Sequence, residues 1–479
     1  MSSIEQQVSI SGDKGLGFAL TVLACAQLVT ALDFNIVYVA LPEIGSRLGF
    51  SPQSLQWVFS AYSVMFGGFL MLGGRAADLF GRRRMFILGV ALYAVSSLLG
   101  GLAQSPLAIV AARAVQGLGG AVLFPATVSL INTLFDEGPE RNRALGLWSL
   151  AGSSGLTLGS IAGGVLVGTL GWSSVFFVNV PIALAVGLGA LKAIPRDEPA
   201  SKRKGFDLPG AMTSTAGVTL LVFTLVQAPE WGWASWSVLF GATAAIALLG
   251  LFVLIESRSA SPIMPLRLVM RGSLAPAMLL TFLFMGTFMA LPYFTTELFQ
   301  RVYLFSPLET GLAFLVPCLA IAAGTQIGSR LAARVGVRTL LALGLAVGAI
   351  GAAFVALSIT PGGGYPALIP GLIIFGLGQG TAWPPMWIAA AAGIPSHEQG
   401  IASGMASTTL WIGGATGLAI LVVIAGYPSG DGASGDTALT LLHSSRSAIL
   451  AIAAGIAMSL PVAFLTSRAA TGQATVIPH

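Results

Sequence analysis

The sequence is short of charge. Of its 479 residues only 9% are charged, 23 Lys and Arg against 18 Asp and Glu, where a soluble globular protein carries about 25%. Hydrophobic residues make up 55% of the chain and the mean hydropathy is +0.87. A soluble fold of this size cannot hide so much apolar surface. The composition therefore excludes a cytosolic enzyme, a nucleic-acid binder and a disordered chain, and indicates one large membrane domain.

Cysteine and histidine are also scarce. Cys25 and Cys318 both lie inside apolar runs, so neither a disulfide framework nor a metal site is predicted. His397, His443 and His479 fall in predicted loops or the tail, and no nucleophile–base constellation accompanies them. A membrane-embedded enzyme needs such a cluster at membrane depth, so we expect no enzyme and no cofactor. A membrane sensor is equally disfavoured, because no soluble signalling domain is evident.

Long apolar runs are abundant. A spanning helix needs about 20 mostly apolar residues, and fourteen runs meet this length. The first run contains Asp33 and is too long for a secretory signal, so we interpret it as an uncleaved span. The predicted fold is an all-α polytopic membrane protein with 14 transmembrane helices. The runs are 16–41, 54–73, 85–103, 107–130, 143–167, 174–194, 208–227, 237–256, 274–298, 307–329, 339–359, 366–390, 401–426 and 447–466.

The basic residues test this count. With an even number of spans and a cytoplasmic N-terminus, 19 of the 23 Lys and Arg fall in segments on the cytoplasmic side. Only Arg47, Arg301 and Arg446 lie outside, and Arg113 lies within a span. Cytoplasmic loops of membrane proteins carry this excess of positive charge. We therefore expect a multi-pass protein of the cell membrane with both termini in the cytoplasm, and the net charge of +5 concerns the membrane rather than nucleic acid.

Short motifs recur in the same order at offsets of 255 to 259 residues. Parallel repeats of this kind are used by secondary transporters to alternate access to a site near the midplane. The sequence therefore predicts an N-terminal six-helix bundle (1–194), a cytoplasmic linker with inserted spans 7 and 8 (195–272) and a C-terminal six-helix bundle (273–479). The recurring motifs are 74–83 with 329–338, 117–125 with 376–384, and Gly146, Gly155 and Gly159 with Gly404, Gly413 and Gly417.

Motifs along the whole chain resemble the major facilitator superfamily in its 14-span drug:proton antiporter branch. The segments that carry the resemblance are 32–42 in span 1, Trp57 and Tyr62 in span 2, 74–84 in the following loop, 113–121 in span 4, 176–181 in span 6 and 306–312 at the start of span 10. Three departures stand out. Asn35 and Tyr38 replace the usual Thr and Asn, and Ser160 replaces the proline of the fifth-span antiporter signature, so the proline kink need not be present.

The resemblance implies a proton-coupled antiporter that exports hydrophobic, cationic small molecules by alternating access. Its partners would be the substrate, protons and the lipid bilayer, it would act as a monomer, and the proton gradient would supply the energy. One alternative shares this fold: a proton-coupled transporter of a single metabolite, such as an antibiotic or a siderophore. Substrate range and direction of transport distinguish the two.

Asp33 is the only acidic residue deep inside a predicted span. It lies eight residues before Leu41, or roughly 12 Å below the predicted end of the span. A carboxylate at that depth costs several kcal/mol to keep ionised, which suits a group that exchanges a proton. A buried charge neutralised purely for packing is the alternative. Arg113, the only basic residue inside a span, needs an acidic or carbonyl partner, and the resemblance implies that it governs protonation of Asp33.

Glu297 lies near the outer end of span 9, four residues before Arg301. An ion pair at the membrane surface explains this spacing, and a cavity-lining role in binding or protonation explains it equally well.

Glycines and charges at two places suggest moving contacts. Gly155, Gly159 and Gly163 lie mostly on one face of span 5, where small residues permit tight helix contact. In the loop after span 2, a salt bridge from Asp78 would hold one transport state, although topological anchoring explains part of its arginine excess. The residues predicted for this loop gate are Gly74, Asp78, Gly81, Arg82 and Arg83.

Aromatic side chains in the spans are candidates for the substrate cavity, because an aromatic cavity with one carboxylate suits amphipathic cations. Lipid contact or core packing explains each of them singly. The candidates are Phe34, Tyr38, Tyr62, Phe66, Trp148, Trp383 and Trp387.

Overall fold

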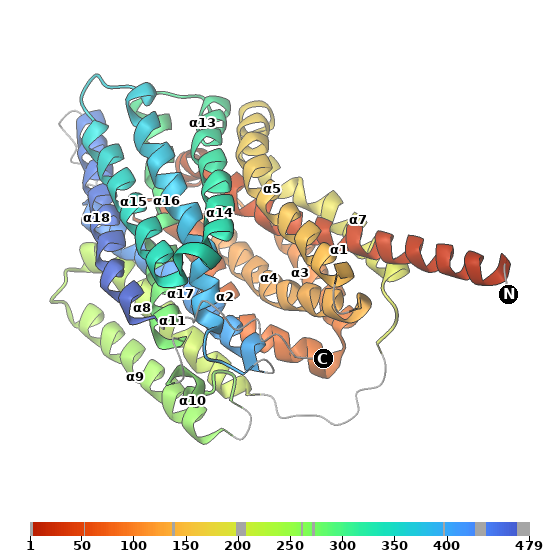
Figure 1. Ribbon diagram of the computed structural model, residues 1–479. Helices are drawn as coiled ribbons and strands as arrows, with labels where there is room; N and C mark the ends of the chain where they lie inside the picture. The colour runs from red at the N-terminus through yellow and green to blue at the C-terminus, as the bar shows by residue number, and fades with distance from the viewer. Residues whose placement is uncertain are drawn as a thin grey trace. The chain divides into compact units, whose positions relative to one another are not determined.

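The chain is helical throughout the residues that its computed structural model describes, and no strand occurs among them (Figure 1). These residues are 3–51, 53–136, 139–197, 207–259, 262–270, 274–395, 398–426 and 437–466.

The helices follow one another with short connections. The first part of the chain contains α1 (Ser3–Leu48), η1 (Ser54–Gln56), α2 (Trp57–Phe80), α3 (Arg82–Gly101), α4 (Pro106–Leu134), α5 (Pro139–Leu170), α6 (Ser174–Phe177) and α7 (Asn179–Ala193). Next come α8 (Leu208–Trp231), α9 (Trp236–Arg258) and α10 (Leu266–Val269). The last part contains α11 (Leu274–Phe288), α12 (Leu291–Glu297), the π-helix η2 (Leu298–Val302), α13 (Pro307–Ala313), α14 (Leu315–Val335), α15 (Val337–Ser358), α16 (Tyr365–Ala391), α17 (Gln399–Ala425) and α18 (Thr437–Leu465).

The predicted all-α fold with fourteen spans is confirmed. Within the described residues, 13 helices are long and apolar enough to cross a membrane. The remaining predicted span, 366–390, is α16, a helix of 27 residues whose mean hydropathy is lowered by Gln379 and by prolines at 370, 384 and 385. Within the described residues, each of the fourteen predicted spans therefore corresponds to a helix or to two consecutive helices.

Several predicted spans differ from the helices of the structure, and spans 274–298 and 307–329 are each interrupted, between α11 and α12 and between α13 and α14. Helix α1 passes through Pro42 and ends at Leu48 rather than Leu41, so Asp33 lies about 22 Å from its end. The sixth span is broken at Val178 into α6 and α7, because Pro181 has no N–H to donate to the preceding turn. Helix α18 begins at Thr437, so the last part of the predicted loop 427–444 is helical.

The backbone repeats as the sequence does. Gly81 ends α2 with φ 103° and ψ 135°, and Gly336, 255 residues later, ends α14 with φ 90° and ψ 142°. Glycines of α5 lie against the Leu28 and Leu32 carbonyls of α1, and Gly413 and Gly417 of α17 lie against the backbone of α11. The same glycine contacts therefore recur in both halves of the chain.

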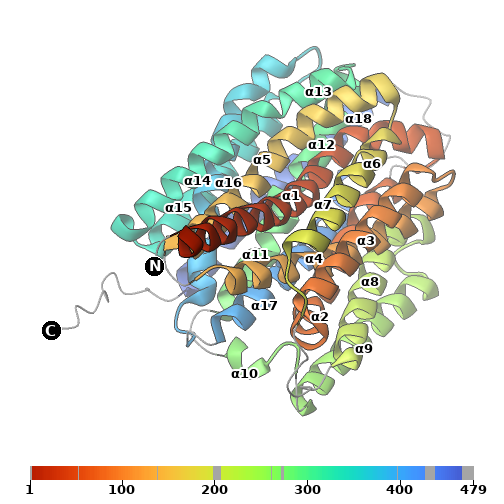
Figure 2. The same cartoon turned by 90° about the vertical axis from the view of Figure 1, so that its right-hand side faces the viewer.

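The chain divides into two compact units. Unit 1 comprises Met1–Thr219, Ala247–Ile263 and Ser306–Leu312, and unit 2 comprises Leu220–Ile246, Met264–Phe305 and Ala313–His479. In unit 1, α1, α4, α5 and α7 lie side by side in both views (Figures 1 and 2).

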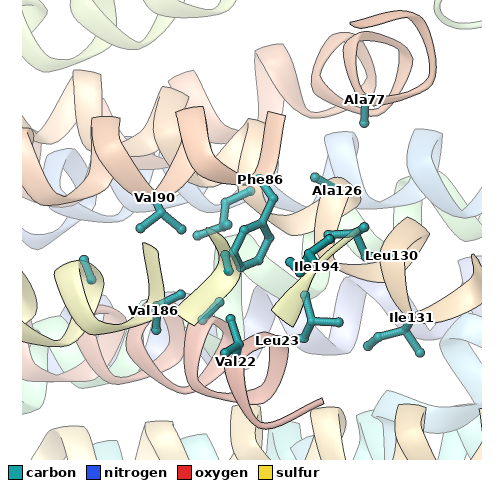
Figure 3. Close-up of a cluster of buried hydrophobic side chains, with 14 of the residues drawn as sticks. Val22, Leu23, Ala77, Phe86, Val90, Ala126, Leu130, Ile131, Val186 and Ile194 are labelled. Carbon is teal, nitrogen blue, oxygen red and sulfur yellow. The ribbon is translucent and has the colours of Figure 1, made fainter. Parts of the chain in front are cut away.

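A core of unit 1 fills the space between α1, α3, α4 and α7. Phe86 is fully buried there and lies among Val22, Leu130 and Val186 (Figure 3). Tight packing of this kind makes each helix position sensitive to the volume of its neighbours. This core therefore supports the buried polar residues on the same helices.

We expect the α1–α5 contact to reject a single methyl group. A Cβ at Gly159 would lie 2.5 Å from the Leu32 carbonyl oxygen, whereas nothing lies within 4 Å of a Cβ at Gly146 on the same helix. Gly159→Ala should lower the free energy of unfolding by about 1–3 kcal/mol. Gly146→Ala should be neutral or stabilising by up to about 1 kcal/mol. Thermal unfolding of the two purified variants checks this, and equal effects would contradict it.

Candidate functional site

Asp33 accepts three side-chain hydrogen bonds in the interior of unit 1. Arg113 Nη1 of α4 donates to Asp33 Oδ2 at 2.6 Å. Gln116 Nε2 of α4 donates to Asp33 Oδ1 at 3.0 Å, and Asn179 Nδ2 of α7 donates to the same oxygen at 2.6 Å. Three helices therefore meet at one carboxylate.

Arg113 makes two hydrogen bonds in addition to its bond with Asp33. Its Nε donates to the Val58 carbonyl of α2 at 2.8 Å, and its Nη1 also donates to Gln116 Oε1 at 2.6 Å. The guanidinium carbon lies 4.5 Å from the centre of the Tyr62 ring, within the range of a cation–π contact. Gln116 Nε2 in turn donates to Ser97 Oγ of α3 at 3.1 Å.

Burial sets the energetics of this pair. Asp33 is 0% exposed and Arg113 is 1% exposed. Two charges in such a place are stable only when they neutralise each other and hydrogen bonds satisfy their remaining groups. The network meets that condition with no exposed member among the residues that bond to Asp33. Adding a proton to Asp33 would remove half of a neutral pair and leave Arg113 with neutral acceptors alone.

Glycine brings α4 close enough for these contacts. A Cβ at Gly117 would collide with the Tyr62 carbonyl, so only glycine permits this approach of α4 to α2. Arg113 and Val58 each lie four residues earlier on their helices, one turn from that contact. The close approach at Gly117 therefore places the guanidinium on the Val58 carbonyl.

Sequence reasoning found the ion pair but not the residues around it. Sequence predicts an acidic or carbonyl partner for Arg113, and the family resemblance implies that it acts on Asp33; in the structure the arginine binds both the Asp33 carboxylate and the Val58 carbonyl. Gln116 and Asn179 were missed as ligands of Asp33, although both lie in motifs that carry the family resemblance. Their signal was polarity within apolar spans.

Asn35 and Ser160, two departures from the family pattern, contact each other. Asn35 Nδ2 of α1 donates to the Leu156 carbonyl of α5 at 2.8 Å and to Ser160 Oγ at 3.2 Å. A proline at 160 would have left the Leu156 carbonyl without its helical donor. In this chain α5 is a continuous helix, and the Asn35 side chain links it to α1 by hydrogen bonds.

The glycine face of α5 meets α1. Cβ atoms at Gly155 and Gly163 would lie 2.6 and 3.1 Å from carbonyl oxygens of α1, as at Gly159. Gly164 instead faces Pro307 and Leu308, the first turn of α13, which belongs to unit 1. The predicted role of these glycines in gating stays a prediction.

The loop after α2 is held by a residue that the sequence did not single out. Asp78 Oδ1 lies 3.7 Å from Arg82 Nη2 in an exposed pair, which contributes little to stability. Asp197 binds more firmly: its two carboxylate oxygens accept from the backbone N–H groups of Arg83 at 2.9 Å and Arg84 at 3.0 Å. Asp197 was predicted to lie in a solvated linker, but it caps α3.

Of the two glycines of this predicted gate, Gly81 lies in a close contact and Gly74 has room for a Cβ. Gly81, with φ 103°, has no room for a side chain because a Cβ would collide with the Asp197 carboxylate. Gly74 faces Pro125 of α4 at 3.6 Å. Arg83 Nη2 donates to the Leu191 carbonyl at 2.7 Å. A cavity of about 350 Å³ opens at this loop, beside Asp78 and Asp197.

The predicted cavity aromatics form a row in unit 1 and a pair in unit 2. Buried Phe34 and Tyr38 both contact Phe59, at 5.3 and 5.4 Å between ring centres. Buried Tyr62 and Phe66 stack at 5.7 Å, and the row continues through Phe124 to Trp148. Trp383 and Trp387 lie 5.6 Å apart in unit 2. Phe59 and Phe124 were missed, and the cavity role of the set stays a prediction.

Glu297 lies in unit 2, whereas the Asp33 network lies in unit 1. Its Oε2 pairs with Arg301 Nε at 2.8 Å, as the spacing predicted. The glutamate side chain, however, is only 7% exposed, against 33% for the arginine. Its Oε1 is buried without a hydrogen-bond partner among the described residues. The carboxylate is therefore buried within unit 2, whereas the arginine is partly exposed.

The π-helix η2 follows Glu297 directly. Before it, the glycine contacts of α1 recur in α11 at an offset of 254, and after it Gly81 recurs as Gly336 at 255. The second half therefore has one more residue in this stretch than the first half. A π-helix takes up an extra residue, and in η2 the Tyr303 N–H donates five residues back to Leu298. The equivalent pair in unit 1, Glu43 and Arg47, is more exposed and 3.9 Å apart.

These features define a polytopic helical membrane protein with a buried ion pair in its N-terminal half and a duplicated scaffold. Residues 23–418 match the Major Facilitator Superfamily. The chain belongs to that family of transporters.

Curated relatives are named as exporters or resistance proteins. The chain is 37% identical over 428 residues to the cephamycin export protein CmcT of Amycolatopsis lactamdurans, covering 88% of this chain and 87% of that protein. It is 37% identical over 407 residues to the puromycin resistance protein pur8 of Streptomyces alboniger, covering 84% and 80%. It is 34% identical over 393 residues to the multidrug resistance protein Stp of Mycobacterium tuberculosis, covering 81% and 72%.

Solved structures share the fold at low identity. The human organic anion transporter MFSD10 matches with a TM-score of 0.62 and 18% identity, covering 94% of this chain and 99% of that one. A peptide transporter POT matches with a TM-score of 0.66 and 15% identity, covering 93% and 95%.

We expect Asp33 and Arg113 to be strongly coupled in stability. Removing either charge leaves the other buried and unpaired, which costs about 3–5 kcal/mol. The double variant Asp33→Asn with Arg113→Met should therefore be destabilised by less than the sum of the single variants. Unfolding of all four proteins in detergent measures this coupling.

The exposed pair Asp78 and Arg82 is the matched control, with an expected coupling below about 1 kcal/mol. Additive single effects at Asp33 and Arg113 would contradict a compensated ion pair.

Proposed function

We propose that this protein is a proton-coupled antiporter that exports hydrophobic, cationic small molecules from the cytoplasm. The buried Asp33–Arg113 pair is the observation that carries the proposal, because it is a carboxylate enclosed within a transporter fold. Relatives named for cephamycin export and puromycin resistance support an antibiotic or drug as the substrate. Both termini would face the cytoplasm, as the distribution of basic residues predicts.

Protonation of Asp33 is the proposed coupling step. The ionised carboxylate holds Arg113, Gln116 and Asn179 together across α1, α4 and α7. When Asp33 takes up a proton, the ion pair is lost and the contacts that draw these helices together weaken. Two helix arrangements that differ in their affinity for the proton are what alternating access requires.

The energy source is adequate for this purpose. One proton moving down a gradient of one pH unit supplies about 1.4 kcal/mol. A membrane potential adds about 2.3 kcal/mol per charge for each 100 mV. Aromatic rings around the site, from Phe34 to Trp148, would attract an amphipathic cation through dispersion and cation–π contacts.

Glu297 is the proposed second carboxylate. Its support is specific: the extra residue at η2 accompanies a buried carboxylate with one unbonded oxygen, whereas the equivalent Glu43 is partly exposed. In this role Glu297 takes part in proton coupling or binds the cationic substrate.

Dedicated export of one antibiotic is the second candidate function. The names of CmcT and pur8 each refer to a single antibiotic, whereas Stp is named for multidrug resistance. A panel of unrelated lipophilic cations and antibiotics in one efflux assay separates the two functions by the number of compounds transported.

We expect Asp33→Asn to abolish efflux driven by a pH gradient. The amide preserves the size of the side chain but cannot exchange a proton. The measurement is transport of a fluorescent lipophilic cation by protein reconstituted in liposomes with an imposed gradient. Substrate exchange without a gradient should persist, which shows that the variant is folded.

The exposed Asp136, in the loop before α5, provides the control, since Asp136→Asn should transport normally. Undiminished pH-driven efflux by Asp33→Asn would overturn the proposed coupling.

We expect Glu297→Gln to weaken transport of a cationic substrate. Loss of a buried negative charge should raise KM by about tenfold, equivalent to about 1.4 kcal/mol. Arg301→Gln is the matched variant, because it breaks the same ion pair and keeps the carboxylate. Equal losses in both variants would assign Glu297 to a structural ion pair only.

A further inference from the structure

Asn179 occupies a singular position in the Asp33 network. Its side-chain amide Nδ2 donates to Asp33 Oδ1 at 2.6 Å, while its Oδ1 is buried and has no hydrogen-bond partner among the described residues. The residue is 0% exposed. A buried amide oxygen without a donor is costly, so its retention beside a carboxylate needs a reason.

We infer that Asn179 senses the protonation state of Asp33 by rotating its side-chain amide. This inference rests on the proposed proton coupling at Asp33. With Asp33 ionised, Asn179 donates through Nδ2, as in the structure. With a proton on Asp33 Oδ1, that oxygen becomes a donor, and Asn179 Oδ1 turns to accept from it.

The rotation keeps one hydrogen bond between Asn179 and Asp33 but gives up the 3.4 Å contact of Nδ2 with the Val175 carbonyl. In each orientation one atom of the Asn179 amide bonds to Asp33 and the other is left over. No proton is transferred to Asn179; the proton stays on Asp33, and only the direction of the hydrogen bond changes. An amide carries donors and an acceptor on one planar group, so half a turn exchanges them.

Gln116 cannot make the same change. Its Oε1 accepts from Arg113 at 2.6 Å, and its Nε2 donates to both Asp33 and Ser97. Turning this amide would break all three contacts and set two donors, Arg113 and the glutamine N–H₂, against each other. Of the two amides on Asp33, only Asn179 has an atom free to take the second role.

Asn179 lies at the start of a helix, where a change in its side-chain contacts can affect the preceding turn. Helix α7 begins at this residue, directly after the break at Val178. The side chain also lies 3.4 Å from the Val175 carbonyl, one turn earlier. Rotation of the amide would break that weak contact. A change in the protonation of Asp33 would therefore affect the turn between α6 and α7.

Other titratable groups around Asp33 are accounted for. Arg113 donates directly to the carboxylate, and the phenols of Tyr62 on α2 and Tyr93 on α3 lie near enough to interact with it. The basic residues of α5 and α7 lie many turns away along their helices. The groups in question are Arg113 of α4, Tyr62 of α2, Tyr93 of α3, Arg143 of α5 and Lys192 of α7.

A pair of variants of equal shape tests the inference. Asn179→Thr keeps a group that both donates and accepts, and Asn179→Val keeps the shape without either function. Both proteins are reconstituted in liposomes, and initial rates of lipophilic-cation efflux are measured across a range of pH. Loss of the stronger, charge-assisted bond should move the half-maximal pH for Asn179→Val upward by about one unit. Asn179→Thr should stay within a few tenths of a unit of the wild type.

Equal profiles in the wild type and both variants would overturn the inference, and so would equal shifts in Thr and Val. A second measurement needs no variant at 179 to fold: infrared difference spectra of wild-type protein with isotope-labelled asparagine, acid minus neutral. A side-chain amide signal should appear in the wild type and vanish in Asp33→Asn. Its absence from the wild type would also overturn the inference.

The two proposals fail in different ways. If Asp33→Asn keeps its pH-driven efflux, the proposed function is wrong. If Asp33→Asn loses that efflux while Asn179→Val retains the wild-type profile, proton coupling stands and only the role of Asn179 is wrong.

Discussion

The contact between Asp33 and Arg113 is the interaction on which the buried polar network of unit 1 depends. An isolated charge at that depth costs several kcal/mol, so the two residues are tolerable only together. Their need for further donors and acceptors extends the network to Val58, Gln116 and Asn179. Four helices are thereby tied to a single carboxylate, and any change in its charge changes the balance among all of them.

Close backbone contact makes that network geometrically possible. An arginine can reach a main-chain carbonyl of the next helix only where the helices nearly touch, and Gly117 against Tyr62 provides the approach. On the other side of α1, Gly159 and its neighbours bring α5 equally close, and Asn35 binds the Leu156 carbonyl across the contact. Polar and glycine contacts therefore serve one purpose, because each permits the other in a medium without water.

The spanning helices could be predicted from sequence because hydrophobic length is a local property. The link between Arg113 and Asp33 was accessible only through the family resemblance, because 80 positions separate the two residues in the sequence. Asn179 was not, because it is 146 positions from Asp33 in the sequence and its orientation depends on the break at Val178. The role of Asp197 could not be predicted for a different reason. In the sequence it is one of several charged residues in a polar linker, and only the structure shows its carboxylate bonded to the first turn of α3.

The duplicated scaffold carries different chemistry in its two halves. At an offset of 254 the position of Asp33 is Thr287, whose hydroxyl donates within its own helix, and at 259 the position of Arg113 is buried Leu372. Where Gln116 binds Asp33 in unit 1, Phe375 packs against Phe288 in unit 2. Close helix contact is thus independent of the ion pair, since Gly413 and Gly417 of α17 contact the backbone of α11 in unit 2, where apolar residues occupy the positions of Arg113 and Gln116. The polar network in unit 1 is an addition to a scaffold that packs without it, and a costly addition of this kind indicates function rather than stability.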